Sequence, residues 1–588
     1  MTAEIKLKDA FKTYTHDQDK VLSPTETVRR LKAKLEQLDL DILDRTVRID
    51  SGRLGIPVFF SYCGRDAAAL TGTRKQMGKG ATAEQAEASA VMELAERFSL
   101  FSFAGDPANF ITATRRELAQ PSLPFEMIAA SVHDTSADLE AARAIFENLP
   151  LKWTGACNLT RRETVWVPFD WFYAINAFNG PSAGNGAEEA LCQGICEIVE
   201  RHTSSIVSRQ RLNCPGIDPD SAAEPLVRQM IDKYRAAGIT VHLTDFTLDM
   251  GIPTVGVLAY DPQTFPAKSE IVWTAGTAPA PEKALSRALT EVAQLAGDFN
   301  SGTRYVASGL PKFSRLEDAD FVTRPAKTVA VSDLPDVSSA NIKTEVERCV
   351  AELAARDLEV LAIETTHPLL GVPAFYTIVP GAHFRERALN TGVGMFAAKL
   401  LVEKLGPAQA ERELEGFEKL LPGKYYTSFY RGTCHLALKD PRQALRYFRQ
   451  ALDRQPTRQD AAAVYSYIGI AYRDMEEYRL ALEALAQGEK NDAERTDIHN
   501  LMGFCHFKLK AHAEAIRSFE KVIALDPSSA IDYANIASNY RDLGQLEDAV
   551  RYYLMALEID PSITFARENL AKLARGLDGT AGGGTRGP

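Results

Sequence analysis

The sequence predicts two architectures in one chain: an α+β region of layered α/β type, followed by an all-α solenoid of helical repeats. Over the first 390 residues, strand-like apolar runs such as 56–62 and 252–261 alternate with long helical patterns. Beyond about residue 425 only helical patterns remain, and they recur with a nearly constant period. With 588 residues, the chain is long enough for about three or four compact units.

Small residues mark the period of the repeats. Gly432, Gly469, Gly503 and Ala537 follow one another at intervals of 37, 34 and 34 residues. An alanine lies twelve residues after each marker, and a large side chain lies sixteen residues after it. Small residues where two helices touch, a large residue that fills the layer and a closing proline form the tetratricopeptide pattern. A solenoid of this kind has a groove that suits a protein or peptide partner.

These patterns divide the chain into four parts. The N-terminal α+β domain is expected over 1–390, and a helical connector over 391–422. The tetratricopeptide repeats with a capping helix are expected over 423–574. The glycine-rich remainder, 575–588, is predicted to be a flexible tail.

Composition and charge exclude several classes of protein. The 67 basic and 78 acidic residues give a net charge of −11, which argues against direct binding to nucleic acid or anionic lipid. The eight cysteines form no C-x-x-C pair, so neither a disulfide framework nor a structural zinc site is expected. No signal peptide and no apolar run of spanning length is visible, so we expect a cytoplasmic protein with no membrane partner.

Three stretches of the N-terminal region resemble one another: 83–96, 187–200 and 281–294. All three have Glu at the second position, Ala at the fourth and Glu at the eleventh. The first two end in Glu-x-x-Glu-Arg and follow glycine-bearing loops at the same distance. The third instead ends with Glu291 and Gln294. The region is therefore expected to contain related helical units.

The two Glu-x-x-Glu pairs predict a metal site. Residues three apart lie close together on a helix, so Glu93 and Glu96 share a face, as do Glu197 and Glu200. Four converging carboxylates repel one another unless cations lie between them, and hard oxygen ligands suit Mg²⁺. A single such pair is more often an exposed acidic face. Two pairs in matched loop–helix contexts favour the metal site.

The loops before the two acidic helices could hold phosphate. Residues 179–185 lead directly into the second helix, where backbone N–H groups and the helix dipole favour an anion. Residues 78–80, Gly-Lys-Gly, hold the same place before the first helix. The loop before the first helix is not a Walker A motif, because the interval from Gly72 to Gly78 is one residue too long and Gly80 replaces Ser or Thr.

Two other interpretations of this region remain open. Residues 180–184 match G-x-S-x-G, which would make Ser182 the nucleophile of a serine hydrolase, although this interpretation leaves the acidic helices unexplained. Cys192 and Cys196 could ligate a metal as thiolates or pack as core thiols. Histidines that could assist Ser182 follow it in the sequence: His202, His242, His367 and His383.

The segments 78–98, 182–202 and 282–294 together resemble the YcaO family, and the resemblance covers roughly 15–390. It implies an α+β domain that binds ATP without a Walker loop and places Mg²⁺ between the two acidic helices. The fused repeats resemble the bacterial branch of that family, which is associated with ribosomal-protein methylthiolation. Domains of the family commonly form homodimers, so a homodimer is expected here.

The resemblance also implies roles for individual residues. The magnesium ligands would be Glu93, Glu96, Glu197 and Glu200. The ATP-binding residues would be Lys20, Thr27, Ser182, Asn185, Glu189, Gln193, Arg201 and Arg287. Among these, Arg201 and Lys20 are the expected phosphate-stabilising residues. No residue of the chain is assigned as a nucleophile, because the nucleophile belongs to the substrate or to a partner.

The function implied by the resemblance is Mg-ATP-dependent O-phosphorylation of a peptide-backbone amide, a step that leads to cyclodehydration or thioamidation of a protein or peptide recruited by the repeats. The alternative is an ATP-binding accessory factor for another modification enzyme, such as the one that methylthiolates a ribosomal protein. Two departures from the family pattern put azoline formation in doubt. Residues 294–296, Gln-Leu-Ala, lack the arginine of Gln-x-Arg, and the chain does not end in a proline-rich segment.

Overall fold

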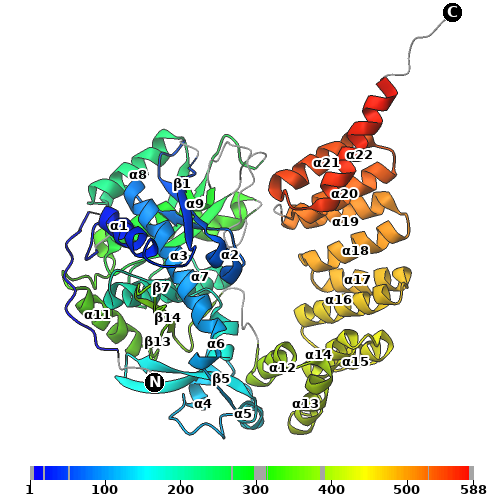
Figure 1. The fold of residues 1–588 in the computed structure, drawn as a ribbon, viewed down its shortest axis with the longest axis horizontal. Helices are drawn as coiled ribbons and strands as arrows, with labels where there is room; N and C mark the ends of the chain where they lie inside the picture. The colour runs from blue at the N-terminus through cyan, green and yellow to red at the C-terminus, as the bar shows by residue number, and fades with distance from the viewer. Residues whose placement is uncertain are drawn as a thin grey trace, which may run out of the picture. The chain divides into compact units, whose positions relative to one another are not determined.

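The computed structural model describes residues 5–16, 20–50, 53–266, 269, 271–296, 313, 315–384, 391–526 and 529–581 (Figure 1). The chain forms two compact units, Met1–Val393 and Gly394–Pro588, here called the N-terminal unit and the repeat unit. The first is a mixed α/β unit with three sheets, and the second is a run of stacked helix pairs. The predicted fold class is therefore confirmed.

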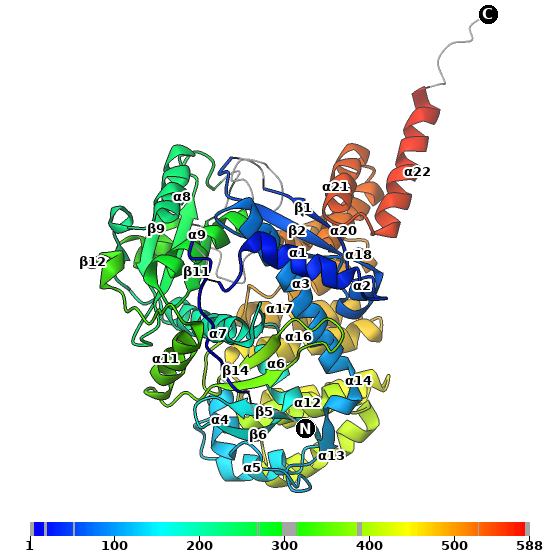
Figure 2. The same cartoon turned by 60° about the vertical axis from the view of Figure 1, so that its left-hand side comes forward.

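Three separate β-sheets, which occupy different parts of the N-terminal unit, form its framework (Figure 2). The three-stranded sheet has the order β1-β2-β3, the five-stranded sheet β11-β10-β9-β8-β12, and the six-stranded sheet β4-β5-β13-β14-β7 with β6 paired to β5. Their strands are β1 (Leu43–Arg48), β2 (Val58–Cys63), β3 (Lys75–Lys79), β4 (Ile111–Ala113), β5 (Leu151–Asn158), β6 (Glu163–Pro168), β7 (Pro181–Ala183), β8 (Gly216–Ile217), β9 (Thr240–Asp245), β10 (Thr254–Tyr260), β11 (Val272–Thr277), β12 (Thr328–Val329), β13 (Leu361–Glu364) and β14 (Ala374–Ile378). All pairings between these strands are antiparallel except that of β12 with β8.

The three similar sequence stretches fold as three strand–loop–helix units, one at the edge of each sheet. Strand β3 leads into α3 (Ala83–Gly105), β7 into α7 (Ala187–Gln210), and β11 into α9 (Pro281–Ala296). Each helix also contacts the edge strand of another unit: α3 contacts β7, α7 contacts β11, and α9 contacts β3. These contacts close a ring of three units.

Small residues let each strand approach its helix closely. A Cβ built on Gly78 of β3 would lie 2.0 Å from the backbone nitrogen of Ala90 in α3. A Cβ on Gly276 of β11 would lie 2.4 Å from the backbone nitrogen of Ala288 in α9. In the unit of β7 and α7 the glycine lies on the helix, at Gly194, and the strand residue that faces it is Ser182.

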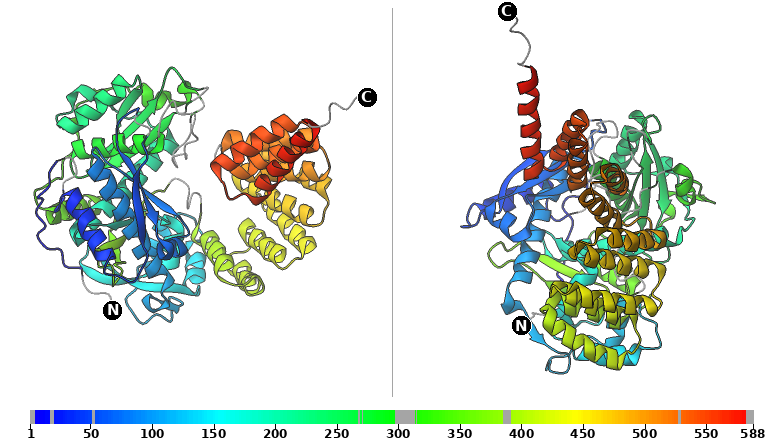
Figure 3. Two further views of the ribbon diagram at one scale, coloured as in Figure 1. Left: turned by 45° about the horizontal axis from the view of Figure 1, so that its top comes forward. Right: turned by 90° about the vertical axis from the view of Figure 1, so that its right-hand side faces the viewer.

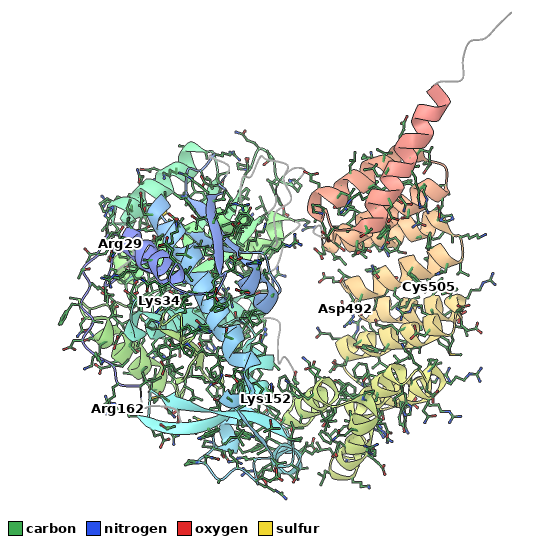
Figure 4. All side chains as sticks on the ribbon, in the orientation of Figure 1. Arg29, Lys34, Lys152, Arg162, Asp492 and Cys505 are labelled. Carbon is green, nitrogen blue, oxygen red and sulfur yellow. The ribbon has the colours of Figure 1, made fainter. Side chains whose placement is uncertain are left out.

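The N-terminal unit contains further helices besides α3, α7 and α9. Helix α1 starts with a proline after Ser23, whose hydroxyl accepts a hydrogen bond from the backbone of Glu26, and it carries Arg29, which is exposed and labelled in Figure 4. Helix α8 packs against α9 in an apolar cluster that also includes residues of β9, β10 and β11. These helices are α1 (Pro24–Leu35), α2 (Arg65–Thr71), α4 (Phe125–Ser131), α5 (Leu139–Glu147), α6 (Phe169–Asn176), α8 (Pro225–Ala236), α10 (Asp320–Thr323) and α11 (Ile342–Ala354).

The repeat unit consists of antiparallel helix pairs, which Figure 3 shows stacked from yellow to red. A Cβ on Gly432, Gly469 or Gly503 would clash with the large side chain sixteen residues later, which confirms the predicted contact within each pair. The helices are α12 (Val393–Lys404), α13 (Pro407–Leu420), α14 (Tyr425–Ala437), α15 (Pro441–Asp453), α16 (Arg458–Asp474), α17 (Tyr478–Asn491), α18 (Thr496–Lys508), α19 (His512–Leu525), α20 (Ala530–Asp542), α21 (Leu546–Ile559) and α22 (Thr564–Ala581).

The ends of the repeat unit differ slightly from the sequence prediction. Helices α12 and α13 fill the connector expected over 391–422. The final helix, α22, continues to Ala581, whereas a flexible tail was expected from residue 575. Residues 582–588 lie outside the described residues. Among the described residues, no helix combines the length and the apolar character that crossing a bilayer requires.

Candidate functional site

A cavity of about 330 Å³ lies in the N-terminal unit where the three related helices meet. Charged side chains of both signs line it. The cations are Lys20, Lys79, Arg97, Arg201 and Arg287, and the carboxylates are Glu93, Glu96, Glu189, Glu197, Glu200 and Glu291. The cavity therefore suits a ligand that combines strong negative charge with a bound cation.

Equivalent positions of the three helices face the same space. The eleventh residues of the three similar stretches are Glu93, Glu197 and Glu291, and all of them line the cavity. The seventh residues do so as well, and Nη1 of Arg287 donates a hydrogen bond to Oε1 of Gln193 over 2.9 Å. The similarity in sequence thus corresponds to a shared orientation toward one site.

Arginines stand beside the two acidic pairs. Nitrogen atoms of Arg97 lie 3.6 Å from carboxylate oxygens of Glu93 and Glu96. Arg201 has the same relation to Glu197 and Glu200, with both distances 3.7 Å. These separations exceed the length of a good hydrogen bond, so the arginines balance the charge of the carboxylates without saturating their oxygens.

Burial disfavours the charged form of carboxylates in the acidic pairs. It raises the pKa of Glu93 and of Glu197, and it raises the pKa of Glu96 well above its ordinary value. Within the described residues, Nη1 of Arg97 and Nε of Arg201 are buried without a hydrogen-bond partner. A cation near the carboxylates and an anion near the guanidinium groups would satisfy both kinds of side chain.

The third helix contributes a different kind of pair. Glu291 of α9 forms an ion pair with Lys79, which ends strand β3 of the first unit. Burial and the charge of Arg287 lower the pKa of Lys79 to about 7. The same arginine lies 3.9 Å from Glu200, whose Oε2 also accepts a hydrogen bond from the backbone N–H of Thr277.

The N-terminal segment completes one wall of the cavity. It brings Lys20 to the lining, and the hydroxyl of Thr27 lies 3.1 Å from the side-chain oxygen of Asn185 at the start of α7. The carboxylate of Glu189 accepts hydrogen bonds from the backbone N–H groups of Val21 and Asn185. Residues more than 150 positions apart are therefore held together at this wall.

The sequence analysis assigned four magnesium ligands and eight ATP-binding residues. Eleven of these twelve residues line the cavity and one, Ser182, does not. Ser182 is fully buried and faces Gly194, and its hydroxyl has no hydrogen-bond partner among the described residues. Sequence reasoning missed the ion pair of Lys79 and Glu291 and the role of Arg97 beside the first acidic pair. The equivalence of the three helices was the signal that could have found Glu291.

The buried positions bear on the two other interpretations. A hydrolase nucleophile has to reach its substrate, whereas Ser182 lies on β7 and is buried against Gly194 of α7. Cys192 and Cys196 are buried in α7. The contact with Cys196 and burial raise the pKa of the Cys192 thiol well above its ordinary value, and the contact with Cys349 and burial do the same for the Cys196 thiol. Both thiols therefore stay protonated at neutral pH, which does not favour metal ligation.

The comparisons with known proteins identify the family. A family model described as YcaO cyclodehydratase, ATP- and Mg²⁺-binding, matches residues 77–383, which is more than half of the chain. The chain belongs to the YcaO family. Three tetratricopeptide models match 426–457, 468–530 and 533–563, as the repeat pattern predicted.

Three known proteins illustrate these similarities. An uncharacterised protein of Methanothermobacter thermautotrophicus is 29% identical over 384 residues, which are 61% of this chain and 93% of that protein. The ribosomal protein S12 methylthiotransferase accessory factor YcaO of Escherichia coli is 26% identical over 343 residues, 52% of this chain and 56% of that protein. A solved heterocyclase in complex with substrate and cofactor is 23% identical, with a TM-score of 0.50 over 65% of this chain and 55% of that chain, and it supports the fold.

The residues of the cavity fit the ATP and Mg²⁺ that the family binds. Carboxylate oxygens are the donors that Mg²⁺ prefers, and guanidinium and ammonium groups suit a triphosphate. Within the described residues, no group of three or more His, Cys, Asp or Glu side chains is already close enough to hold a metal ion. The fit therefore rests on the donor chemistry and on the buried, unpartnered arginine N–H groups.

Proposed function

We propose that this protein uses Mg-ATP to phosphorylate the oxygen of a backbone amide in a protein or peptide substrate. The observation that carries the proposal is the pair of Glu-x-x-Glu-Arg sets, on α3 and α7, which face one cavity together with three further cations. A cavity that brings carboxylates and cations together can hold both the metal and the phosphates of a metal–triphosphate complex. The membership of the YcaO family supports the same chemistry.

The proposed reaction transfers the γ-phosphoryl group of ATP to the amide oxygen. The bond between the γ-phosphorus of ATP and its bridging oxygen breaks, ADP leaves, and a new bond forms between that phosphorus and the amide oxygen. A nucleophile from the substrate or a partner forms a bond to the amide carbon and loses its proton to solvent. The bond between that carbon and its original oxygen then breaks, and the oxygen leaves with the phosphate. The bound Mg-ATP supplies the phosphoryl group, and the protein supplies position and charge.

The side chains of the cavity divide this work. Glu93, Glu96, Glu197 and Glu200 would hold Mg²⁺. Lys20, Arg201 and Arg287 would contact the phosphates, and Lys79 would add a further positive charge. The remaining candidates, Thr27, Asn185, Glu189 and Gln193, would bind the nucleotide from the wall that the N-terminal segment completes. Ser182 would act only by supporting the loop before α7.

Calorimetric titration tests the metal assignment. Replacing Glu197 or Glu93 by Gln keeps the size of the side chain and removes a charge, so magnesium-dependent ATP binding should weaken at least tenfold. The matched control is Glu84→Gln, because Glu84 lies in the first turn of the same helix as Glu93 but is exposed and does not line the cavity. Full affinity in both cavity variants, with the fold intact, would refute the assignment.

The repeat unit would recruit the substrate. Tetratricopeptide arrays bind proteins or peptides on their concave surface, and the helices here stack as that architecture requires. The homodimer and the cytoplasmic location expected from the sequence belong to the same proposal. Sedimentation of the purified chain tests the homodimer.

A second candidate function is that of an accessory factor that binds ATP without using it for chemistry. The similarity to the Escherichia coli accessory factor over 52% of this chain favours it. The two functions differ in turnover. An amide-activating enzyme releases ADP when its protein substrate is present and stops when Glu197 is replaced, whereas an accessory factor binds Mg-ATP and releases no ADP.

A further inference from the structure

An exposed aromatic side chain contacts Arg97, one of the residues that line the cavity. Phe178 follows helix α6 and is 48% exposed. The guanidinium carbon of Arg97 lies 5.1 Å from the centre of its ring, and the ring of Phe101 lies 5.9 Å away. Arg97 lines the cavity and stands next to Glu93 and Glu96, so Phe178 is one side chain removed from the proposed metal ligands.

The backbone holds Phe178 in this exposed position at a cost. Ala177 has φ 48° and ψ −109°, a conformation that an L-residue adopts only under strain. Two anchors support it: the buried hydroxyl of Tyr376 lies 3.4 Å from the carbonyl oxygen of Ala177, and the backbone N–H of Gly180 donates to the carboxylate of Glu197. A single exposed phenylalanine is ordinary, but one on a strained turn tied to a metal-site carboxylate calls for an explanation.

The distance along helix α3 fits a peptide substrate. Glu93, Arg97 and Phe101 follow one another at intervals of four residues and so share one face. Each interval corresponds to about 6 Å along the helix axis. Phe178 packs on the second and third of these residues, so it lies about one to two intervals from Glu93. An extended peptide covers about 3.3 Å per residue, so two to four residues span this distance.

We propose that Phe178 is a docking residue for the polypeptide whose amide is activated in the cavity. The inference rests on the proposed function, because an amide that reaches the phosphoryl group carries polypeptide on both sides, and each arm has to leave the cavity across its rim. Phe178 is an exposed aromatic side chain in contact with Arg97 of the cavity lining. The segment that contacts Phe178 is an extended part of the substrate, two to four residues from the reacting amide. The flat ring packs against its side chains or peptide planes, while Arg97 holds the ring from behind.

Photo-crosslinking in the full chain tests this inference. p-Benzoylphenylalanine replaces Phe178 in one variant and Phe11 in the matched control, since Phe11 is a 61% exposed phenylalanine of the same unit that pairs with Asn341. The probe is a biotinylated library of random twelve-residue peptides, applied with Mg²⁺ and a non-hydrolysable ATP analogue. We expect position 178 to capture at least five times more peptide than position 11, and unlabelled library to compete with the capture.

Two outcomes would overturn the inference: equal capture at both positions, or crosslinks at position 178 that join two copies of this chain. Calorimetry of the wild type and of Phe178→Leu separates this inference from the proposed function. If neither protein binds Mg-ATP, the proposed function fails and the docking inference falls with it. If both bind Mg-ATP equally and position 178 captures no peptide above the control, the docking inference alone fails.

Discussion

Replacing Gly78 by Ala should destabilise the N-terminal unit, because the added Cβ would meet backbone atoms. The built Cβ lies 2.0 Å from the nitrogen of Ala90 and 2.5 Å from the carbonyl oxygen of Ala86. Ordinary contacts between such atoms begin near about 3.5 Å, so strand β3 would have to move away from α3 by roughly 1 Å or more. Overpacking of this kind costs about 1–3 kcal/mol. We expect a value of about 3 kcal/mol, because no flexible side chain can yield instead.

Urea denaturation followed by tryptophan fluorescence measures this loss. All four tryptophans, at positions 153, 166, 171 and 273, belong to the N-terminal unit, so the signal reports on that unit alone. The control is Gly105→Ala. Gly105 is the last residue of α3, the helix that Gly78 faces, and nothing lies within 4 Å of the added Cβ. Because alanine favours helix over glycine, the control should be neutral or stabilising by up to about 1 kcal/mol. Equal unfolding midpoints for the two variants would refute the reasoning.

Three further predictions concern binding. Above its pKa of about 7, Lys79 loses its charge in the free protein, so ATP affinity should fall as the pH rises from about 6 to 8. The Lys79→Arg variant should show a smaller fall in calorimetry, and parallel pH profiles would contradict the role of this lysine. Thr27→Val removes the contact with Asn185 and should weaken ATP binding about fivefold, or about 1 kcal/mol; unchanged affinity would argue against this wall as part of the site. A chain without 423–588 should bind Mg-ATP within about twofold of the full chain but should lose engagement of its protein partner, and equal activity on the physiological target would refute the division of labour.

Local sequence geometry explains what could be predicted. The Glu-x-x-Glu pairs had to share a helix face because an α-helix has a fixed turn, and the repeat markers had to meet because their spacing equals one helix pair. The approach of Gly432 to Phe448 follows from that spacing. The position of Lys20 and Thr27 beside the acidic helices came from the family resemblance, since nothing in the spacing of these residues indicates it.

Contacts between distant parts of the chain explain what could not be predicted. Lys79 and Glu291 are 212 residues apart and meet only because α9 contacts the edge strand β3. The burial of Ser182 depends on Gly194. In the other two units the glycine lies on the strand, whereas in the unit of β7 and α7 it lies on the helix, and Ser182 faces it. The G-x-S-x-G pattern does not indicate this difference. The strained turn at Ala177 is likewise contacted by Tyr376, which lies 199 residues further along the chain on strand β14.

The N-terminal segment has a consequence for anyone who dissects this protein. The boundary at residue 77, where the family match begins, would be the natural place to cut an isolated domain. That fragment would retain all four glutamates of α3 and α7, yet it would lack Lys20, Thr27 and the first two strands of the three-stranded sheet. It would also lose the main-chain groups that occupy the carboxylates of Glu188 and Glu189. The compact unit that holds the cavity therefore starts well before the segment by which the family is recognised.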